Sequence, residues 1–378
     1  MHPGVPMPIP ADEFPIHQAP YSFAHAASSD RNFYDRSYWN AHDRSGEVFL
    51  ITGLGQYPNL GTTDAFACIR RGDLQHTIRM SDALGADRMN QKVGPYRIEV
   101  IDPLNELRLT CDGRDQEFEF DLRWRGSFPA VDESPHISRN GAKIMLDAQR
   151  FAQVGTWEGF IRVKGEEIAV DPSTWVGTRD RSWGIRPVGE PEPAGRWVAE
   201  PKADGGFYWI YVPLRFDDFA LIFIAQEDGD GLRTLNDALR VWPDGRVEPL
   251  GYPRYEINYR SGSRIPESAR ITAQASDGSP LVVEVECLGH VALSAGCGYG
   301  PDPQWTHGLW KGRDWVETAT YDLTDQADPG IMIATQYSIL DHVGRATLDG
   351  KVGFGLFEHS CAGRHTPSGF TDAGSMAP

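Results

Sequence analysis

Short turn signals recur along almost the whole chain and separate segments in which polar and apolar residues alternate. Asp-Gly or Asn-Gly pairs begin at Asp112, Asn140, Asp204, Asp228, Asp244, Asp277 and Asp349. Such pairs readily adopt the positive φ angles of tight hairpin turns. Residues 117–125 alternate strictly, as a half-buried strand does. The apolar face of this segment would consist of Phe118, Phe120, Leu122 and Trp124. The chain is therefore predicted to form antiparallel sheets.

Two other segments, 207–212 and 219–225, are apolar on both faces. This pattern is typical of strands that are buried between a barrel interior and a second layer. Only residues 31–42 and 232–241 are predicted as short helices. No internal repeat with a period of about 20 to 50 residues is visible, which argues against propellers and solenoids. The predicted fold class is all-β, with two antiparallel β-barrels or sandwiches in tandem and few short helices.

The length of 378 residues exceeds what one hydrophobic core usually serves, so two domains are expected. Prolines and glycines interrupt regular structure between residues 171 and 193, and the domain junction is predicted there. The predicted organisation is a flexible tail at 1–20, an N-terminal barrel at 21–185, a C-terminal barrel at 186–365 and a second flexible tail at 366–378.

The 53 acidic and 36 basic residues give a net charge of −17, which repels nucleic acids and anionic lipid surfaces. No apolar stretch approaches the roughly 18 residues of a membrane span, and the N-terminus lacks the pattern of a signal peptide. We therefore expect a cytoplasmic protein with no nucleic-acid partner and no membrane insertion. The five cysteines form no Cys-x-x-Cys pair, so a disulfide framework or a structural zinc site is not expected.

The segment 177–187 concentrates more candidate functional residues than any other part of the chain. It holds three arginines, an aspartate and a tryptophan between glycines. In a strand, alternate residues share a face, so Arg179, Arg181 and Trp183 would point one way and Asp180 the other. Flanking arginines would keep the pKa of Asp180 low. The segment is interpreted either as a ligand site at the domain junction or as a salt-bridged connector between domains.

Aromatic residues and a histidine give further candidates. His307 lies between Trp305 and Trp310 in the sequence and would serve as an acid or base in an apolar cavity, or as a structural hydrogen-bond donor. Tyr208 belongs to a predicted strand. Its side chain is interpreted either as part of the hydrophobic core or as a phenolic proton donor in the site.

The acidic residue Glu358 directly precedes His359. Strand geometry places the two side chains on opposite faces, so they would not share one ion. The histidine spacing matches no compact metal motif, and no metal site is predicted.

The central segment resembles the Arg-Asp-His-Ser-Trp-Gly type segment of the carotenoid 1,2-hydratase and AttH-like (hydroxyneurosporene synthase-like) superfamily. Residues 155–159, 307–310 and 357–359 are also similar to uncharacterised branches of that superfamily. The resemblance implies two lipocalin-like β-barrels in tandem, hydratase or cyclase relatives, and no organic cofactor. Carried over by position, the histidine and tryptophan implicated in hydration fall on Arg181 and Trp183, and a tyrosine and aspartate pair falls on Tyr208 and Ile210.

Ile210 departs from the pattern, because it cannot supply the strong acid that protonation of an unactivated alkene requires. Arg181, Trp183 and Tyr208 would instead stabilise an oxyanion or enolate. We therefore expect a lyase or isomerase, hydratase-like and free of cofactors, that acts on a hydrophobic, oxygenated small molecule such as a terpenoid, steroid or aromatic compound.

The expected site lies near the junction of the barrels. The predicted catalytic residues are Arg181, Trp183, Tyr208, His307 and Asp180, and the predicted substrate-binding residues are Arg179, Trp209, Tyr211, Trp305, Trp310 and Glu358. The alternative is a non-catalytic lipocalin-like carrier of a hydrophobic small molecule, since fold alone does not separate the two. A homodimer is left open as the assembly.

Overall fold

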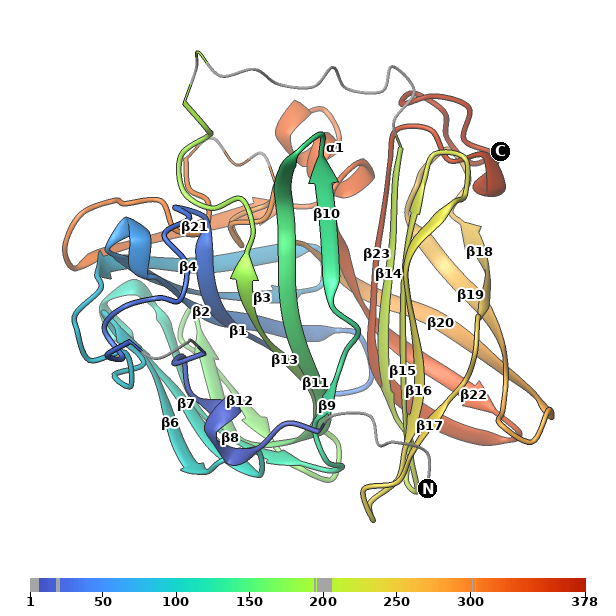
Figure 1. Cartoon of the computed structure of the whole chain (residues 1–378), viewed down its shortest axis with the longest axis horizontal. Helices are drawn as coiled ribbons and strands as arrows, with labels where there is room; N and C mark the ends of the chain where they lie inside the picture. The colour runs from blue at the N-terminus through green and yellow to red at the C-terminus, as the bar shows by residue number, and fades with distance from the viewer. Residues whose placement is uncertain (1–6, 18–20, 194, 196–205, 301, 303) are drawn as a thin grey trace.

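The computed structural model describes residues 7–17, 21–193, 195, 206–300, 302 and 304–378. Two antiparallel sheets curl into half-barrels that lie side by side (Figure 1). The one α-helix in this part of the chain is α1 (Pro329–Gln336), and no helix there is long and apolar enough to cross a membrane. The prediction of an all-β fold with two barrel-like halves is confirmed.

The first sheet has the strand order β21-β4-β3-β2-β1-β13-β11-β8-β7-β6-β5, and β9, β10 and β12 also pair with β11. Its strands are β1 (Phe33–His42), β2 (Val48–Tyr57), β3 (Thr62–Arg71), β4 (Leu74–Ala83), β5 (Lys92–Val93), β6 (Tyr96–Asp102), β7 (Glu106–Gly113), β8 (Phe118–Gly126), β9 (Val131–Asp132), β10 (His136–Asn140), β11 (Lys143–Val163), β12 (Glu166–Val170), β13 (Val176–Ile185) and β21 (Trp315–Asp322). The edge strand β21 comes from the later half of the sequence and pairs with β4. The first sheet is therefore not built from residues 21–185 alone.

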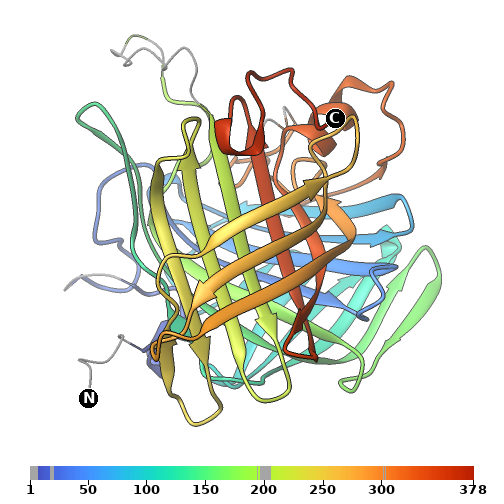
Figure 2. The same ribbon diagram turned by 90° about the vertical axis from the view of Figure 1, so that its right-hand side faces the viewer.

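The second sheet has the order β17-β16-β15-β14-β23-β22-β20-β19-β18. Its strands are β14 (Phe207–Arg215), β15 (Ala220–Asp228), β16 (Arg233–Val241), β17 (Val247–Pro249), β18 (Arg254–Tyr259), β19 (Pro266–Gln274), β20 (Pro280–Ala292), β22 (Leu340–Leu348) and β23 (Lys351–Ala362). In Figure 2, the strands β18 to β20 cross in front of β14 to β16, so the sheet curls back over its own face.

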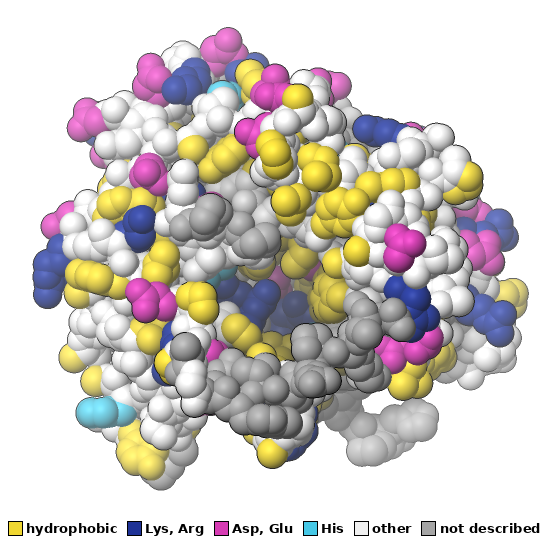
Figure 3. All heavy atoms as spheres, turned by 90° about the horizontal axis from the view of Figure 1, so that it is seen from above, with side chains coloured by type: hydrophobic (Ala, Val, Ile, Leu, Met, Phe, Trp, Pro, Cys, Tyr) yellow, Lys and Arg dark blue, Asp and Glu magenta, His cyan; other side chains and the backbone are white. Residues whose placement is uncertain are grey.

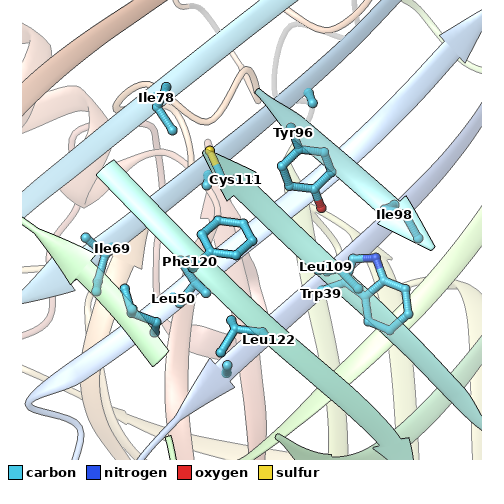
Figure 4. Close-up of a cluster of buried hydrophobic side chains, with 14 of the residues drawn as sticks. Trp39, Leu50, Ile69, Ile78, Tyr96, Ile98, Leu109, Cys111, Phe120 and Leu122 are labelled. Carbon is cyan, nitrogen blue, oxygen red and sulfur yellow. The ribbon is translucent and has the colours of Figure 1, made fainter. Parts of the chain in front are cut away.

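Three hydrophobic cores hold these layers together. The first fills the concave side of the first sheet, where Trp39, Leu50 and Phe120 meet (Figure 4). The second joins the two sheets, and the third fills the second half-barrel. Strand β14 contributes to both of the last two, with Tyr211 in one and Ile210 in the other. The prediction of strands that are buried on both faces is thus confirmed.

The two predicted helices are wrong. Residues 31–42 contain β1, which lies between β2 and β13 in the first sheet. Residues 232–241 contain β16, in which the odd-numbered residues Leu235, Leu239 and Val241 lie on one buried face. Pairing with neighbouring strands on both sides overrides the local helix propensity of these segments.

Several of the predicted hairpin turns are present. Asp349 and Gly350 have φ angles of 48° and 77° and connect β22 to β23. Positive φ at both central residues is the requirement of a type I′ turn. The pair at Asp204 lies outside the described residues.

Both terminal segments pack against the sheets where free tails were predicted. Glu13, in the short 3-10 helix η1 (Pro10–Glu13), is 1% exposed because its carboxylate pairs with Arg179 inside the first half-barrel. Phe370 is also 1% exposed, and Arg264 donates hydrogen bonds to the carbonyls of Asp372 and Ser375. These buried contacts fix segments whose composition suggests disorder.

Gly177 allows β13 to approach β1 closely. A Cβ atom there would lie 1.9 Å from the carbonyl oxygen of Asn40, which accepts a hydrogen bond from Trp157 Nε1 at 2.8 Å. The substitution Gly177→Ala is therefore expected to lower the free energy of unfolding by about 1–3 kcal/mol or more, because the strands must separate. Guanidinium unfolding measures the change. Gly85→Ala is the matched control, since its Cβ meets no atom within 4 Å, and an equal effect of both would contradict the prediction.

Candidate functional site

A cavity of about 370 Å³ lies between the two sheets. The first sheet contributes residues from β1, β10, β11 and β13, and the second contributes residues from β14, β15 and β23. Seen from above, the molecule is hollowed between the sheets, with Lys or Arg side chains at the bottom and hydrophobic side chains around the rim (Figure 3). The site is amphipathic, as a pocket for an oxygenated hydrophobic molecule would be.

Strand β13 separates this cavity from the interior of the first half-barrel. Its side chains alternate as the sequence predicted, and Asp180 and Ser182 line the cavity. Arg179 and Arg181 point to the other side, where they contact residues of the first half-barrel. The cavity therefore lies on the aspartate side of the strand, whereas the sequence analysis placed the site on the arginine side.

Arg181 belongs to a buried ion network. Its Nη2 lies 3.1 Å from Oδ1 of Asp35, whose Oδ2 lies 3.5 Å from Arg88 and 3.2 Å from His17. Burial alone would raise the pKa of Asp35, but Arg181 in particular, with His17 and Arg88, outweighs burial and holds this pKa below its usual range. Arg181 is thus salt-bridged, but its partners belong to the first half of the molecule, so this network does not connect the two halves as the predicted connector would.

The N-terminal segment completes this network. Glu13 accepts hydrogen bonds from Nη1 and Nη2 of Arg179 at 2.6 and 2.8 Å. The ring of His17 stacks on Trp183 with the centroids 3.6 Å apart. Arg179 and Trp183 are therefore covered by residues 13–17 on the side of the sheet that faces away from the cavity.

Asp180 lines the cavity together with two other described carboxyl groups, those of Glu133 and Glu358. Burial raises its pKa to about 6, although Arg150 acts in the opposite direction. This is the reverse of the low pKa expected from its flanking arginines, because those side chains lie across the strand. Among the described residues, Asp180 has no ion-pair partner within 4.0 Å. A carboxyl group with such a pKa exchanges protons readily near neutral pH.

A second acid group lies on the opposite wall, where Asp341 of β22 and Glu358 of β23 face each other in register. Burial raises the pKa of both carboxyl groups. The charge of Glu358 and a hydrogen bond between the two raise the pKa of Asp341 further. The pKa of Asp341 is therefore raised both by its burial and by its acidic neighbour.

Tyr38 connects this acid pair to the cavity. Its hydroxyl donates to Oδ2 of Asp341 at 2.5 Å, and Trp209 Nε1 donates to Glu358. Tyr38 and Glu358 line the cavity, while Asp341 lies behind them. The sequence analysis identified Glu358 but missed Asp341, whose only signal was a second acidic residue before a histidine.

Arg150 and Glu133 form an ion pair on the wall contributed by the first sheet. The guanidinium also lies over the rings of Tyr211 and Trp209, at 4.7 and 5.6 Å from their centroids. Burial raises the pKa of Glu133 to about 7 against the opposing effect of Arg150. The pair thus adds a second carboxyl group that can change protonation near neutral pH.

The remaining predicted site residues are distributed over several places. Trp209 lines the cavity, and Tyr211 is buried beneath Arg150. Tyr208 lies in the core of the second half-barrel and stacks on His365.

His307 lines a neighbouring hollow of about 530 Å³, with its pKa lowered to about 4 by burial and then by Arg36. Trp305 is fully buried beside His307, whereas Trp310 is 51% exposed.

His359 bonds to the Trp209 carbonyl and to Tyr259 on the far side of the sheet from Glu358. Within the described ranges, no group of three or more His, Cys, Asp or Glu side chains is arranged to hold a metal ion.

Solved structures with similar folds share little sequence with this chain. A candidate AttH protein from Nitrosomonas europaea has a TM-score of 0.53 at 14% identity, with 87% of this chain and 92% of that one covered. CghA in complex with Sch210972 has a TM-score of 0.52 at 10% identity, with 89% and 90% covered. A second structure of CghA gives 0.50 at 11% identity, with the same coverage. These likenesses support an AttH-like, lipocalin-like fold.

No curated protein matches the sequence. A family model does match it, over residues 9–371. The match includes both sheets, the inter-sheet cavity and the N-terminal residues that pair with Arg179. The chain therefore belongs to the family of unknown function DUF8625.

Proposed function

We propose that the protein is a hydratase-like lyase or an isomerase, which transfers protons to and from a hydrophobic, oxygenated small molecule in the inter-sheet cavity. The observation that carries this proposal is Asp180, a buried carboxyl group on the cavity wall with a pKa of about 6 and no ion-pair partner among the described residues. Perturbed carboxyl groups in a cleft are typical of acid and base catalysts.

The acid pair on the second sheet supports the same reading. Tyr38 and Glu358 line the cavity, and both lie next to Asp341, whose pKa is raised by burial and then by the charge of Glu358. Asp180 and the group formed by Tyr38, Asp341 and Glu358 would be two proton-transfer sites on a bound substrate, one giving a proton and the other accepting one. Two carboxyl sites in different environments can thus take opposite roles at one pH.

The proposed acid and base differ from those carried over by resemblance. Asp180 and Glu358 take the place of Arg181 and Tyr208, because the latter two side chains do not line the cavity. A carboxylic acid of this kind is what protonation of an alkene or an enolate requires, so hydration, elimination and isomerisation all fit the site.

Native mass spectrometry of the purified protein, followed by organic extraction, identifies the small molecule that travels with it. That molecule is then incubated with the protein in D₂O, and its deuterium content is measured over time. Wild type should introduce deuterium at carbon, and Asp180→Asn should slow this exchange by about 10²-fold or more. The wild-type rate should change around pH 6, the pKa of Asp180, and the variant should lose this inflection.

Asp218→Asn is the control, because Asp218 is an exposed carboxylate paired with Lys351 far from the cavity wall. Exchange that is equally fast in wild type, Asp180→Asn and Glu358→Gln would overturn the proposal. A ligand that binds tightly but exchanges no deuterium in wild type would favour a carrier.

A further inference from the structure

Two arginines of the inter-sheet cavity have no acidic partner. Arg36 lies on β1 and is 7% exposed, and Arg186 follows the end of β13. Among the described residues, no carboxylate oxygen lies within 4.0 Å of either guanidinium. Burial disfavours the charged form of Arg36, but Tyr57, Tyr299, Tyr34 and Asp64 together outweigh it and raise the pKa of Arg36. The guanidinium thus stays charged with no described carboxylate in direct contact, and it can pair with an anionic ligand.

Three other buried arginines around the cavity and in the first half-barrel are paired with carboxylates. Arg150 pairs with Glu133, Arg179 with Glu13, and Arg181 with Asp35. The absence of a described carboxylate partner at Arg36 and Arg186 is therefore not a general property of the buried arginines in this interior.

The ring of Tyr299 lies near both guanidiniums. Their carbon atoms are 5.4 and 5.7 Å from its ring centroid, and Arg36 also lies 5.2 Å from the ring of Tyr34. Ring faces attract cations and orient them, but they carry no net negative charge. Burial, and then the charge of Arg36, lowers the pKa of Arg186. The two cations are thus close enough to repel each other.

The position of this pair matches a ligand site. Arg36, Arg186 and Tyr299 line both the inter-sheet cavity and the neighbouring hollow of about 530 Å³. Figure 3 shows Lys or Arg side chains at the bottom of the hollow between the sheets. A ligand in the cavity would reach both guanidiniums and Asp180, which line the same walls.

We propose that Arg36 and Arg186 together bind one anionic oxygen group, a carboxylate or an enolate, at the end of an otherwise hydrophobic ligand. Guanidinium groups bind carboxylates through paired, charge-assisted hydrogen bonds. This inference rests on the proposed function and makes it more specific. The substrates would be organic acids and their tautomers, with the charged end beside Tyr299.

The probe pair is 2-naphthoxyacetate and 2-(2-naphthyloxy)ethanol, which share an aromatic skeleton and differ in the carboxylate. Isothermal titration of each into the full-length protein should show that wild type binds the acid at least tenfold more tightly than the alcohol. Arg36→Met and Arg186→Met should each weaken binding of the acid by at least tenfold and change binding of the alcohol by less than threefold. Arg270→Met, at an arginine of the far sheet that pairs with Glu284, should match wild type.

Thermal unfolding without ligand supplies a second readout. Both Met variants should unfold cooperatively, and Arg186→Met should unfold at a temperature equal to or higher than wild type, because burial and the charge of Arg36 disfavour the Arg186 cation. Equal affinity of wild type for acid and alcohol, or an unchanged preference in both variants, would overturn the inference. If the protein prefers the acid but exchanges no deuterium, it is a carrier of organic acids and the proposed function fails. If it exchanges deuterium without preferring the acid, it is an enzyme for neutral substrates and this inference fails.

Discussion

Asparagine in place of Asp35 is expected to lower the free energy of unfolding by about 3–5 kcal/mol. The carboxylate is fully buried and faces Arg181, Arg88 and His17, at distances of 3.1, 3.5 and 3.2 Å. Asparagine keeps the shape of the side chain but removes its charge, so two buried guanidiniums lose their partner. Chemical unfolding followed by circular dichroism measures the loss.

The matched comparison is the exposed pair of Lys351 and Asp218, in which Asp218→Asn should change stability by less than about 1 kcal/mol. A double variant, Asp35→Asn with Arg181→Met, should recover part of the loss, because one unpaired cation is removed with its partner. If Asp35→Asn has no larger effect than Asp218→Asn, the network does not stabilise the fold and the case for Arg181 as a structural residue fails.

Buried neutral histidines are expected to make the fold sensitive to acid. Burial lowers the pKa of His42, His290 and His359 to about 3, and it lowers that of His342 well below the usual value. In the unfolded chain these side chains bind protons near pH 6.5. Their contribution to stability is therefore complete above about pH 6.5 and is lost as the pH falls toward 3, at about 1.4 kcal/mol per pH unit for each histidine.

Carboxyl groups with raised pKa values act in the opposite direction. As the pH falls, Asp180 and Glu133 bind protons in the folded state near pH 6 and 7, at a higher pH than in the unfolded chain. The pKa values of Asp341 and Glu358 are also raised in the folded state. Their protonation favours folding as the pH falls, so it offsets part of the histidine effect. The difference between wild type and a single histidine variant isolates one group from this sum.

His290→Gln is the variant of choice, since Nε2 of His290 is buried without a hydrogen-bond partner. Between pH 6 and 4, its free energy of unfolding should fall less steeply than that of wild type, by about 1.4 kcal/mol per pH unit. Urea unfolding at five pH values measures both slopes. His25→Gln, at an exposed histidine, should run parallel to wild type. Equal slopes for all three proteins would show that His290 is protonated in the folded state.

Alternation and turn signals were sufficient to predict the fold class. Phe118 to Trp124 form β8 as predicted, and the Asp349 turn joins two strands. Segments 31–42 and 232–241 were misassigned because their helix propensity is local, whereas their strand pairing depends on neighbours elsewhere in the chain. Strand β21 could not be assigned to the first sheet for the same reason, since its partner β4 lies more than 200 residues earlier.

The site was harder to predict than the fold. Alternation correctly separated Asp180 from Arg181, but the sequence does not say which face of a strand looks into a cavity. The pairing of Asp341 with Glu358 depends on the register between β22 and β23, which only the folded sheet defines. Likewise, Glu13 reaches Arg179 from a segment whose composition indicates a tail. Each miss concerns a contact between residues that are distant in sequence.

The position of β21 also bears on how the chain is made. During synthesis, β1 to β13 leave the ribosome long before residues 315–322 exist, so the edge of β4 stays open while the second half is translated. An open strand edge can pair with other chains. A nascent or truncated N-terminal half is therefore prone to aggregate, and separate expression of the two halves would give a first sheet that lacks its last strand.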